Sequence, residues 1–274
     1  LTKIDLVNYY QLAEKRILPH LANRPVSLLR APSGIEGQLF FQKHADTLHI
    51  PGLKELDPAF DPGHPALIGI DTLEALLGAA QMNVIEFHTW NATTKNIEKP
   101  DRMVFDLDPG EGLAWSMMLE AANLARTLLE EIGLQCFLKT SGGKGLHVIV
   151  PLKPRDDWET VKDFSKAISQ HLAAVLPSLF VALSGPRNRV GKVFVDYIRN
   201  SRGATTAAAY SVRARPGLGV SVPCSWQELS TLTGGAQWAI ANVQNRLKST
   251  DDPWTDYAKT KQTLKPSMRK ILMH

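Results

Sequence analysis

Cysteine is scarce in this sequence, which has two cysteines, Cys136 and Cys224, among 274 residues. Two such residues make neither a disulfide framework nor a spaced set of zinc ligands, so disulfide-rich secreted domains are excluded and a reducing cytosol is expected. Apolar runs long enough to cross a bilayer are missing as well, and the N-terminus has no signal peptide. We therefore expect a cytoplasmic protein with no membrane partner.

The sequence also lacks a large excess of charge of either sign. Lys and Arg number 31 against 27 Asp and Glu, which gives a net charge of +4. This excess permits a polyanionic partner but is too small to demonstrate one, so only clustering of basic residues can decide. The hydrophobic share of 44% and the charged share of 21% are ordinary for a globular protein.

The length allows one large domain, which we divide into an N-terminal α/β module (1–100), a core (101–220) and a C-terminal helical segment (221–274). The chain starts Leu1-Thr2-Lys3 without an initiator Met and enters a helical pattern at once, so we expect a piece of a longer polypeptide.

Hydrophobic periodicity in the first hundred residues predicts mixed helices and strands. A helix is expected over Ile4–Leu18, closed by Pro19 and Pro25. Asp71-Thr72-Leu73-Glu74 has the form of a capping box and should open a second helix that runs to about Met82. Residues 44–65, rich in Pro, Gly, Asp and His, predict an irregular loop. The expected strands are Val26–Arg30, Gln38–Gln42, Ala66–Ile70 and Asn83–Trp90.

From Met103 the predicted elements alternate as β-α-β-β-α-β, the pattern of a ferredoxin-like sheet in an α+β fold. One helix should bury Met117, Ala121, Leu124, Leu128 and Ile132, and the other Val161, Phe164, Ile168, Leu172 and Val175. The expected strands are Met103–Leu107, Leu134–Lys139, Leu146–Leu152 and Val193–Ile198. If their spatial order is the usual 4-1-3-2, the first strand lies antiparallel between the third and the fourth.

Carboxylates follow this first strand. Asp106 and Asp108 lie two residues apart and therefore point to the same face. Asp196, in an otherwise apolar strand, would lie on the neighbouring strand in the predicted order. Three carboxylates together suit one or two divalent metal ions, as in phosphoryl-transfer enzymes. The alternative for Asp196 is an ion pair with Arg199 or Arg202.

A glycine-rich turn, Ser141-Gly142-Gly143-Lys144-Gly145, precedes His147. Glycines let backbone N–H groups converge on phosphate oxygens, Ser141 adds a hydroxyl and Lys144 a positive charge. The spacing is not that of a Walker A motif. A plain hairpin turn is the alternative, since glycines serve that role too.

Basic and aromatic residues predict contacts to nucleotides and nucleic acid. If Tyr210–Arg215 is a strand, Arg213 and Arg215 share a face, which suits a triphosphate clamp or a charged edge strand. Of Phe40 and Phe41, which point to opposite faces of a strand, at most one can be core, and an exposed ring could stack on a base. His88 alone reads more readily as a hydrogen-bonded core histidine. The remaining candidates for nucleic-acid contacts are Lys3, Lys43, Arg199 and Arg202.

Together these motifs resemble the polymerase domain of bacterial DNA ligase D, in the archaeo-eukaryotic primase-polymerase superfamily. The matching stretches are EFHTWN (86–91), VFDLDPG (104–110), KTSGGKGLHVIVPL (139–152) and VFVDYIRNSRGATTAAAYSVRARPG (193–217). The resemblance implies a primase-polymerase fold and a nucleotidyltransferase that fills gaps and extends broken ends in non-homologous end joining.

The resemblance also implies roles for single residues. The metal ligands would be Asp106, Asp108 and Asp196, holding Mn²⁺ or Mg²⁺. The incoming nucleoside triphosphate would contact His88, Ser141, Lys144, His147 and Arg213. Lys3 would bind a 5′-phosphate, and Phe40 and Phe41 would stack on the template. Implied partners are gapped or broken DNA, ligase and phosphoesterase domains of the same polypeptide, and the Ku end-binding protein, all at the bacterial nucleoid.

Two other functions remain open from the residues alone. Nucleotide cyclases also place two metal-binding Asp residues on a ferredoxin-like sheet. A non-catalytic nucleic-acid binder could use the sheet face to stack bases, although it would leave the three carboxylates unexplained.

Overall fold

A six-stranded sheet forms the centre of the computed structural model, which describes residues 1–45, 50–249 and 251–272. Its strand order is β12-β7-β8-β6-β10-β9, and β6 runs antiparallel to both β8 and β10. This order contains the predicted 4-1-3-2 arrangement, so the α+β class and the ferredoxin-like core are confirmed. The strands are β6 (Arg102–Pro109), β7 (Phe137–Thr140), β8 (Leu146–Pro151), β9 (Phe180–Val181), β10 (Val193–Asp196) and β12 (Pro223–Cys224).

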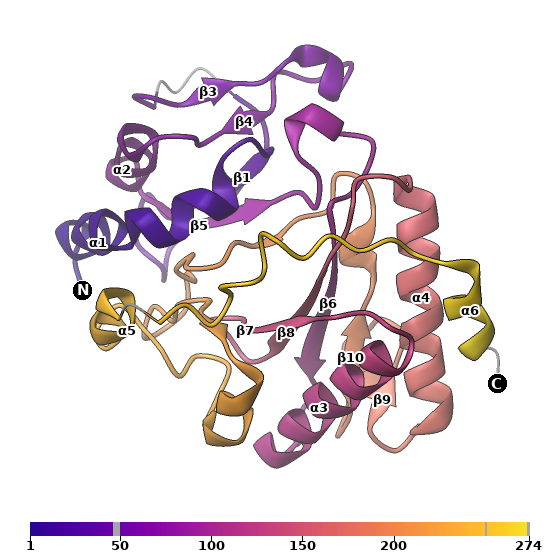
Figure 1. Ribbon diagram of the computed structural model, residues 1–274. Coiled ribbons are helices and arrows are strands. Elements are labelled where there is room, and N and C mark those ends of the chain that lie inside the picture. The colour runs from indigo at the N-terminus through magenta and orange to yellow at the C-terminus, as the bar shows by residue number, and fades with distance from the viewer. Residues whose placement is uncertain (46–49, 250, 273–274) are drawn as a thin grey trace.

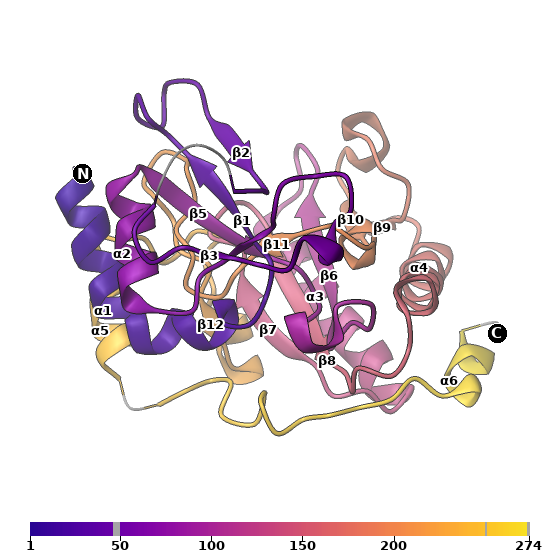
Figure 2. The same cartoon turned by 90° about the horizontal axis from the view of Figure 1, so that it is seen from above.

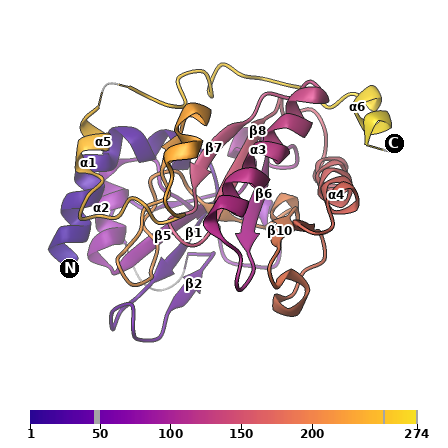
Figure 3. The same ribbon diagram turned by 90° about the horizontal axis from the view of Figure 1, so that it is seen from below.

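Alternation along the strands gives this sheet two different faces. Phe105 and Leu107 of β6 pack with Val148 of β8 against helices α3 (Trp115–Glu131) and α4 (Trp158–Val175). Both helices lie on that face, as Figure 3 shows for α3 in front of the strands. Asp106 and His147, one position along, therefore point to the opposite face, which the helices leave uncovered.

The N-terminal elements gather on one side of this sheet (Figure 1). They build a second, four-stranded sheet in the order β11-β5-β1-β2, whose strand β11 comes from the chain after β10. Helices α1 (Lys3–Leu21) and α2 (Leu73–Gln81) pack with it in one hydrophobic cluster. The strands are β1 (Val26–Arg30), β2 (Phe40–Gln42), β5 (Val84–Thr89) and β11 (Thr206–Ala207), beside a small pair of β3 (Lys54–Glu55) and β4 (Ile68–Gly69).

A buried asparagine links the two halves. The Asn200 side chain donates to Val104 O and accepts from Val104 N, both at 2.8 Å, and so pairs with β6 as a neighbouring strand would. Asn91, just after β5, donates to Asn200 Oδ1 at 3.2 Å. These bonds fix the chain that leaves Asp196 beside the strand that carries Asp106.

Residues 221–274 are less helical than expected. They hold the short helices α5 (Gln244–Lys248) and α6 (Pro266–Ile271), one 3₁₀ turn and strand β12, and the rest of their described part is irregular. The segment crosses the molecule, so that α6 lies far from α1 (Figure 1). Within the described residues, no helix combines the length and the apolar character that a bilayer span requires.

Several predicted boundaries were wrong. Helix α1 continues through Pro19 to Leu21, because buried Ile17 and Leu21 hold its last turns on the core even though proline lacks an N–H donor. Thr72, not Asp71, caps α2, since Thr72 Oγ1 accepts from Ala75 N at 3.2 Å.

The two core helices also differ in detail from the prediction. Met118 and Ala122 of α3 are fully buried where Met117 and Leu124 are only partly so, which shifts the buried face by about one position. At the end of α4, Val175 is 65% exposed because the helix has passed the edge of the sheet. Part of the predicted loop 44–65 lies outside the described residues.

Tyr210–Arg215 is not a regular strand. Only Val212 forms a bridge, to Val220, and Tyr210 has a left-handed φ of 66°. Backbone bonds join this segment to residues 219–221, as in Arg213 N to Gly219 O at 2.7 Å. Side-chain bonds join it to β5: Glu86 Oε1 accepts from Ala214 N at 2.7 Å, and Ser211 Oγ accepts from Phe87 N at 2.8 Å.

Candidate active site

Three carboxylates meet on the face of the six-stranded sheet that is turned away from α3 and α4, where Val104 and Ile149 pack with the N-terminal elements. Asp106 on β6 is the register partner of Asp196 on β10 and of His147 on β8. Asp108 follows on the same face of β6. The predicted strand order thus brings these four side chains together, and Figure 2 shows β6 and β10 side by side.

Arginines contact all three carboxylates. Arg199 Nε lies 3.1 Å from Asp196 Oδ2 and 3.7 Å from Asp106 Oδ2. Arg189 Nη1 lies 3.2 Å from Asp108 Oδ2. The ion pair of Asp196 with Arg199 that we had kept as an alternative is therefore present, whereas Arg202 pairs with Glu98.

Burial and mutual repulsion shift the pKa values of the carboxylates. Burial and the charge of Asp106 raise the pKa of Asp108 to about 6. Burial also raises the pKa of Asp196, with Asp106 adding to the shift and Arg199 opposing it. For Asp106, burial is outweighed by His147, Arg199 and Lys139, so its pKa falls. Negative charge at Asp108 and Asp196 is thus costly without a further cation.

The donor set fits a hard divalent ion. Mg²⁺ and Mn²⁺ favour carboxylate oxygens, and these three residues offer them on two adjacent strands. Asp106 and Asp196 are 8% and 7% exposed, so a bound ion would be largely shielded from water. His147 Nδ1, also buried, has no hydrogen-bond partner within the described residues, which leaves one more acceptor at the site.

His147 and Lys139 continue the row of side chains across β8 and β7. Burial and the neighbouring Lys139 lower the pKa of His147 to about 4, so the ring is neutral at pH 7 and can donate to Asp106 Oδ1, 3.2 Å from Nε2. Lys139 is 2% exposed, and burial with nearby Arg213 lowers its pKa far below the usual range. Its Nζ donates to Ala207 O at 3.0 Å, which ties β7 to β11.

The glycine-rich turn is held together by its own serine. Ser141 Oγ accepts from Gly143 N and Gly145 N, both at 3.1 Å, and Gly142 N donates to Gly235 O at 2.9 Å. We expected the glycine N–H groups to point at phosphate, but these three are satisfied within the protein. The Ser141 hydroxyl proton and the Lys144 ammonium remain as donors.

Close approach explains two of the glycines in this turn. Gly142 has a φ of 70°, and a Cβ there would lie 2.8 Å from Arg213 Cγ. A Cβ at Gly145 would lie 2.2 Å from Leu107 O, on the strand of the carboxylates. Only glycine lets the turn pack this tightly against β6.

A cavity of about 1160 Å³ opens beside the carboxylates. It is large enough for a nucleotide-sized ligand, and its basic residues come from four different segments. The predicted residues that line it are Asp106, Asp108, Ser141, Gly143, Lys144, His147, Arg199, Arg213 and Arg215.

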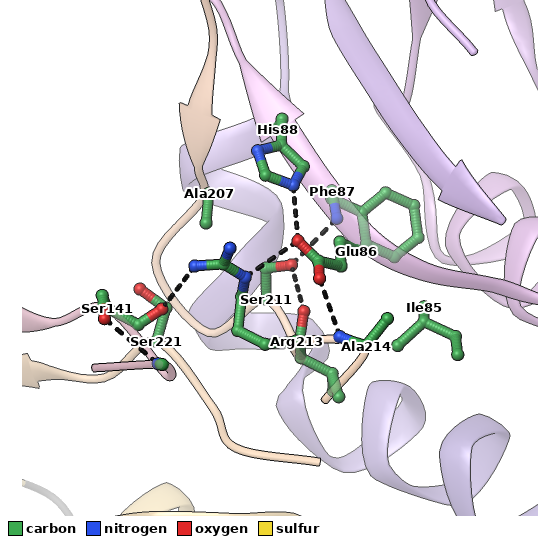
Figure 4. Close-up of polar contacts among 12 residues, drawn as sticks. Ile85, Glu86, Phe87, His88, Ser141, Ala207, Ser211, Arg213, Ala214 and Ser221 are labelled. Atoms are coloured by element: carbon green, nitrogen blue, oxygen red, sulfur yellow. Dashed lines mark hydrogen bonds and ion pairs between the residues drawn. The ribbon is translucent and has the colours of Figure 1, made fainter. Parts of the chain in front are cut away.

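Glu86 organises the side of the site that includes Arg213 (Figure 4). Glu86 Oε2 lies 2.8 Å from Arg213 Nε and 2.7 Å from His88 Nε2, and Arg213 Nη1 donates to Ser141 O at 2.9 Å. Burial opposes ionisation of Glu86, but the hydrogen bond from His88 and the charge of Arg213 lower its pKa to about 2. His88 therefore supports Arg213 through Glu86 and is not itself among the lining residues.

The residues predicted to contact nucleic acid lie at the surface. Phe40 and Phe41 are 47% and 46% exposed, so both rings are available, where we had allowed for one in the core. The ring of Phe41 lies edge-on to His88 with centroids 5.4 Å apart. Lys43 is exposed, and Lys3 lines a separate hollow of about 320 Å³ with Asn83 and Gly217.

Sequence reasoning missed four contributors to the site. Glu86 and Lys139 lie within the stretches that resemble the family, but the sequence does not indicate which residue a single charged side chain in a strand contacts. Arg189 comes from a loop without periodicity. The doublet Gly234-Gly235 was the available signal for the segment 233–237, which lines the cavity and packs on the glycine turn.

Comparisons with known proteins agree with this geometry. The family model described as "LigD, primase-polymerase domain" matches residues 2–254. A multifunctional non-homologous end joining protein LigD of Pseudomonas aeruginosa is 58% identical over 273 residues, which are 99% of this chain and 32% of that protein. The LigD of Mycobacterium tuberculosis strain H37Rv is 35% identical over 236 residues, 83% of this chain and 31% of that protein.

A solved structure shares the fold as well. The polymerase domain of Mycobacterium tuberculosis ligase D in complex with DNA superposes with a TM-score of 0.84 at 32% identity, covering 92% of this chain and 91% of that one. The chain spans roughly a third of the length of these two curated relatives. It belongs to the LigD primase-polymerase domain family.

Proposed function

We propose that this domain is a metal-dependent nucleotidyltransferase that adds nucleotides to the 3′-hydroxyl of a DNA primer. The observation that carries the proposal is a row of three carboxylates, of which Asp106 and Asp108 line a large cavity and Asp196 lies next to Asp106 on the neighbouring strand. Lys144, Arg213 and Arg215 line the same cavity. Carboxylates alone repel a triphosphate. A divalent cation bound by the carboxylates would attract the phosphates instead, so the carboxylates and the basic cavity can act together on a nucleotide.

Each side chain has a definable task in this reaction. Asp106, Asp108 and Asp196 would hold Mn²⁺ or Mg²⁺, and the bound ion would lower the charge of the α-phosphate and favour ionisation of the primer hydroxyl. Lys144, Arg213 and Arg215 would bind the β- and γ-phosphates, where charge grows as pyrophosphate leaves. Ser141 would orient a phosphate oxygen beside them, and neutral His147 would hold the carboxylate of Asp106 through its Nε2–H.

DNA would approach along the second sheet. The exposed rings of Phe40 and Phe41 support base stacking on a template strand, with Lys43 beside them for the backbone. Lys3, beside its own hollow, would receive a 5′-phosphate across a gap. By kinship with LigD, we place the reaction in the filling of gaps and extension of broken ends during end joining, together with ligase and phosphoesterase domains and the Ku protein. Ribonucleotides are included among the substrates.

Primer extension tests the proposal directly. Purified domain, a primer–template with a gap, and a nucleoside triphosphate should give a lengthened primer and pyrophosphate with Mn²⁺, and nothing after EDTA. Asp106→Ala should abolish addition yet keep the fold and DNA binding, because Asp106 positions a metal and is not part of the apolar core. Lys153→Ala, an exposed lysine away from the cavity, is the matched control.

Other products would overturn it. A cyclic nucleotide would indicate a cyclase, and inorganic phosphate a phosphohydrolase. DNA binding without any metal-dependent product would indicate a binding module.

A further inference from the structure

Two histidines and an aspartate cluster on the N-terminal half, on elements that the carboxylate site does not use. His44 Nε2 lies 2.7 Å from Asp61 Oδ2, and His64 Nδ1 lies 3.5 Å from the same oxygen. One ligand atom from each of the three lies within 4.8 Å of the other two. We refer to His44, Asp61 and His64 as the histidine–aspartate cluster.

The backbone holds this cluster in place. His44 follows β2 and bridges Leu67, and Ala45 N donates to Ala66 O at 2.7 Å. Asp61 ends a 3₁₀ turn, Pro58–Phe60, which Asp57 caps, and His64 N donates to Asp61 O at 3.3 Å. Both imidazoles thus reach one carboxylate from separate, hydrogen-bonded stretches of chain.

We propose that the histidine–aspartate cluster is a second metal site, which takes a borderline transition-metal ion of the Zn²⁺ class. Imidazole nitrogens favour Zn²⁺ over the harder Mg²⁺ and Mn²⁺, and two histidines with one carboxylate leave the fourth tetrahedral position for water.

The dimensions agree with this assignment. Tetrahedral zinc bonds of about 2.0–2.2 Å place ligand atoms roughly 3.3 Å apart. The His64–Asp61 separation is already close to that value, and the His44–Asp61 separation needs to open by about 0.6 Å on this estimate. Each ring presents a nitrogen to Asp61 Oδ2. Because the rings stack with an interplanar angle of 8° and centroids 5.1 Å apart, they would tilt toward each other to direct both nitrogens at one ion.

Nearby charge limits the affinity but does not forbid binding. Arg202 is an arginine whose charge acts on Asp61, and its Nη2 donates to Phe60 O at 2.7 Å. Glu98 offsets the positive charge of Arg202, because both of its carboxylate oxygens accept from Arg202 Nε at 3.0 Å.

An ion bound here would connect the start of the segment between β2 and β4, at His44, to its later part, at Asp61 and His64. It would fix the strand that carries Phe40 and Phe41, which lies at the edge of its sheet and projects from the molecule (Figure 2). The ion would thus act by holding the chain at His44, three residues from Phe41.

Zinc retention in a domain with a disabled carboxylate site tests the proposal. The background is Asp106→Asn/Asp108→Asn, stripped with chelator, incubated with Zn²⁺ alone and dialysed. We expect about one bound ion per chain and a melting temperature higher by roughly 5 °C at saturating Zn²⁺. Mn²⁺ at the same concentration should give neither.

His64→Ala and Asp61→Asn should each weaken Zn²⁺ binding more than about tenfold, since even residues that only support a ligand have effects of that size. The His64 side chain is 59% exposed, so its replacement leaves the core intact. His171→Ala, a histidine on α4, is the matched control and should retain the ion. Equal retention by His64→Ala, or no retained Zn²⁺ in the background itself, would overturn the proposal and leave the cluster a hydrogen-bonded ion pair.

Discussion

Arg199 Nε lies 3.1 Å from Asp196 Oδ2, which puts a guanidinium charge between two carboxylates of the proposed metal site. The same nitrogen is 3.7 Å from Asp106 Oδ2. A divalent ion that binds these oxygens therefore competes with Arg199. The arginine side chain is 42% exposed, so water screens this competition and allows the guanidinium to move aside.

Arg199→Gln should accordingly bind Mn²⁺ more tightly than the unmodified domain. Removal of one partly screened charge is worth about 1 kcal/mol, or roughly a fivefold lower Kd. The Kd is measured by titrating the domain with Mn²⁺ and following the magnetic resonance signal of the unbound ion. Arg202→Gln, whose partner is Glu98, should leave the Kd unchanged; an unchanged Kd for Arg199→Gln as well would show that the guanidinium does not compete.

Lys144→Ala and Arg213→Ala should weaken the use of nucleotide more than the use of DNA. Each removes a charged hydrogen bond to phosphate, worth about 1.5–3 kcal/mol, or about 10- to 150-fold in kcat/KM for the nucleotide. Steady-state extension at varied nucleotide and varied DNA separates the two. A loss confined to DNA affinity would place these residues on the DNA track.

Glu86 should make stability depend on pH in the acid range. Its pKa falls from 4.5 to about 2 in the folded state, so its contribution is complete above about pH 4.5 and is lost as the pH falls toward 2. The difference corresponds to roughly 3 kcal/mol. Urea unfolding between pH 2 and 6 should show a shallower acid slope for Glu86→Gln.

That variant carries its own check. At pH 7 Glu86→Gln should also loosen Arg213 and raise the KM for nucleotide, because the carboxylate holds the guanidinium in place. An acid slope equal to that of the unmodified domain would mean that Glu86 is not the titrating group.

Lys3 should matter only when the DNA carries a 5′-phosphate downstream of the gap. A phosphate dianion attracts an ammonium more strongly than a backbone monoanion does, so Lys3→Ala should erase the preference for phosphorylated gaps. Binding and gap filling on matched substrates at one salt concentration measure this. Lys15→Ala, exposed on the same helix, should keep the preference; equal losses on both substrates would make Lys3 a general electrostatic contact.

The local sequence pattern was sufficient to predict the strands of the core, but not the residues that hold the site's side chains in place. The two-residue spacing of Asp106 and Asp108 and the strand order followed from alternation and topology. The path of Tyr210–Arg215 did not, because it depends in part on buried Glu86, which lies more than a hundred residues earlier and accepts hydrogen bonds from Arg213 and Ala214. Helix α1 runs past Pro19 for a similar reason: tertiary packing outweighed a local stop signal.

The contact between segment 233–237 and the glycine turn bears on how the domain is made. A Cβ at Gly235 would lie 2.5 Å from Gly145 O, so this late segment is seated directly on a turn that forms much earlier in synthesis. Chains emerge from the ribosome N-terminus first, so the segment 233–237 is made after every strand that carries a carboxylate. The cavity wall can therefore close only after Gln237 has been translated.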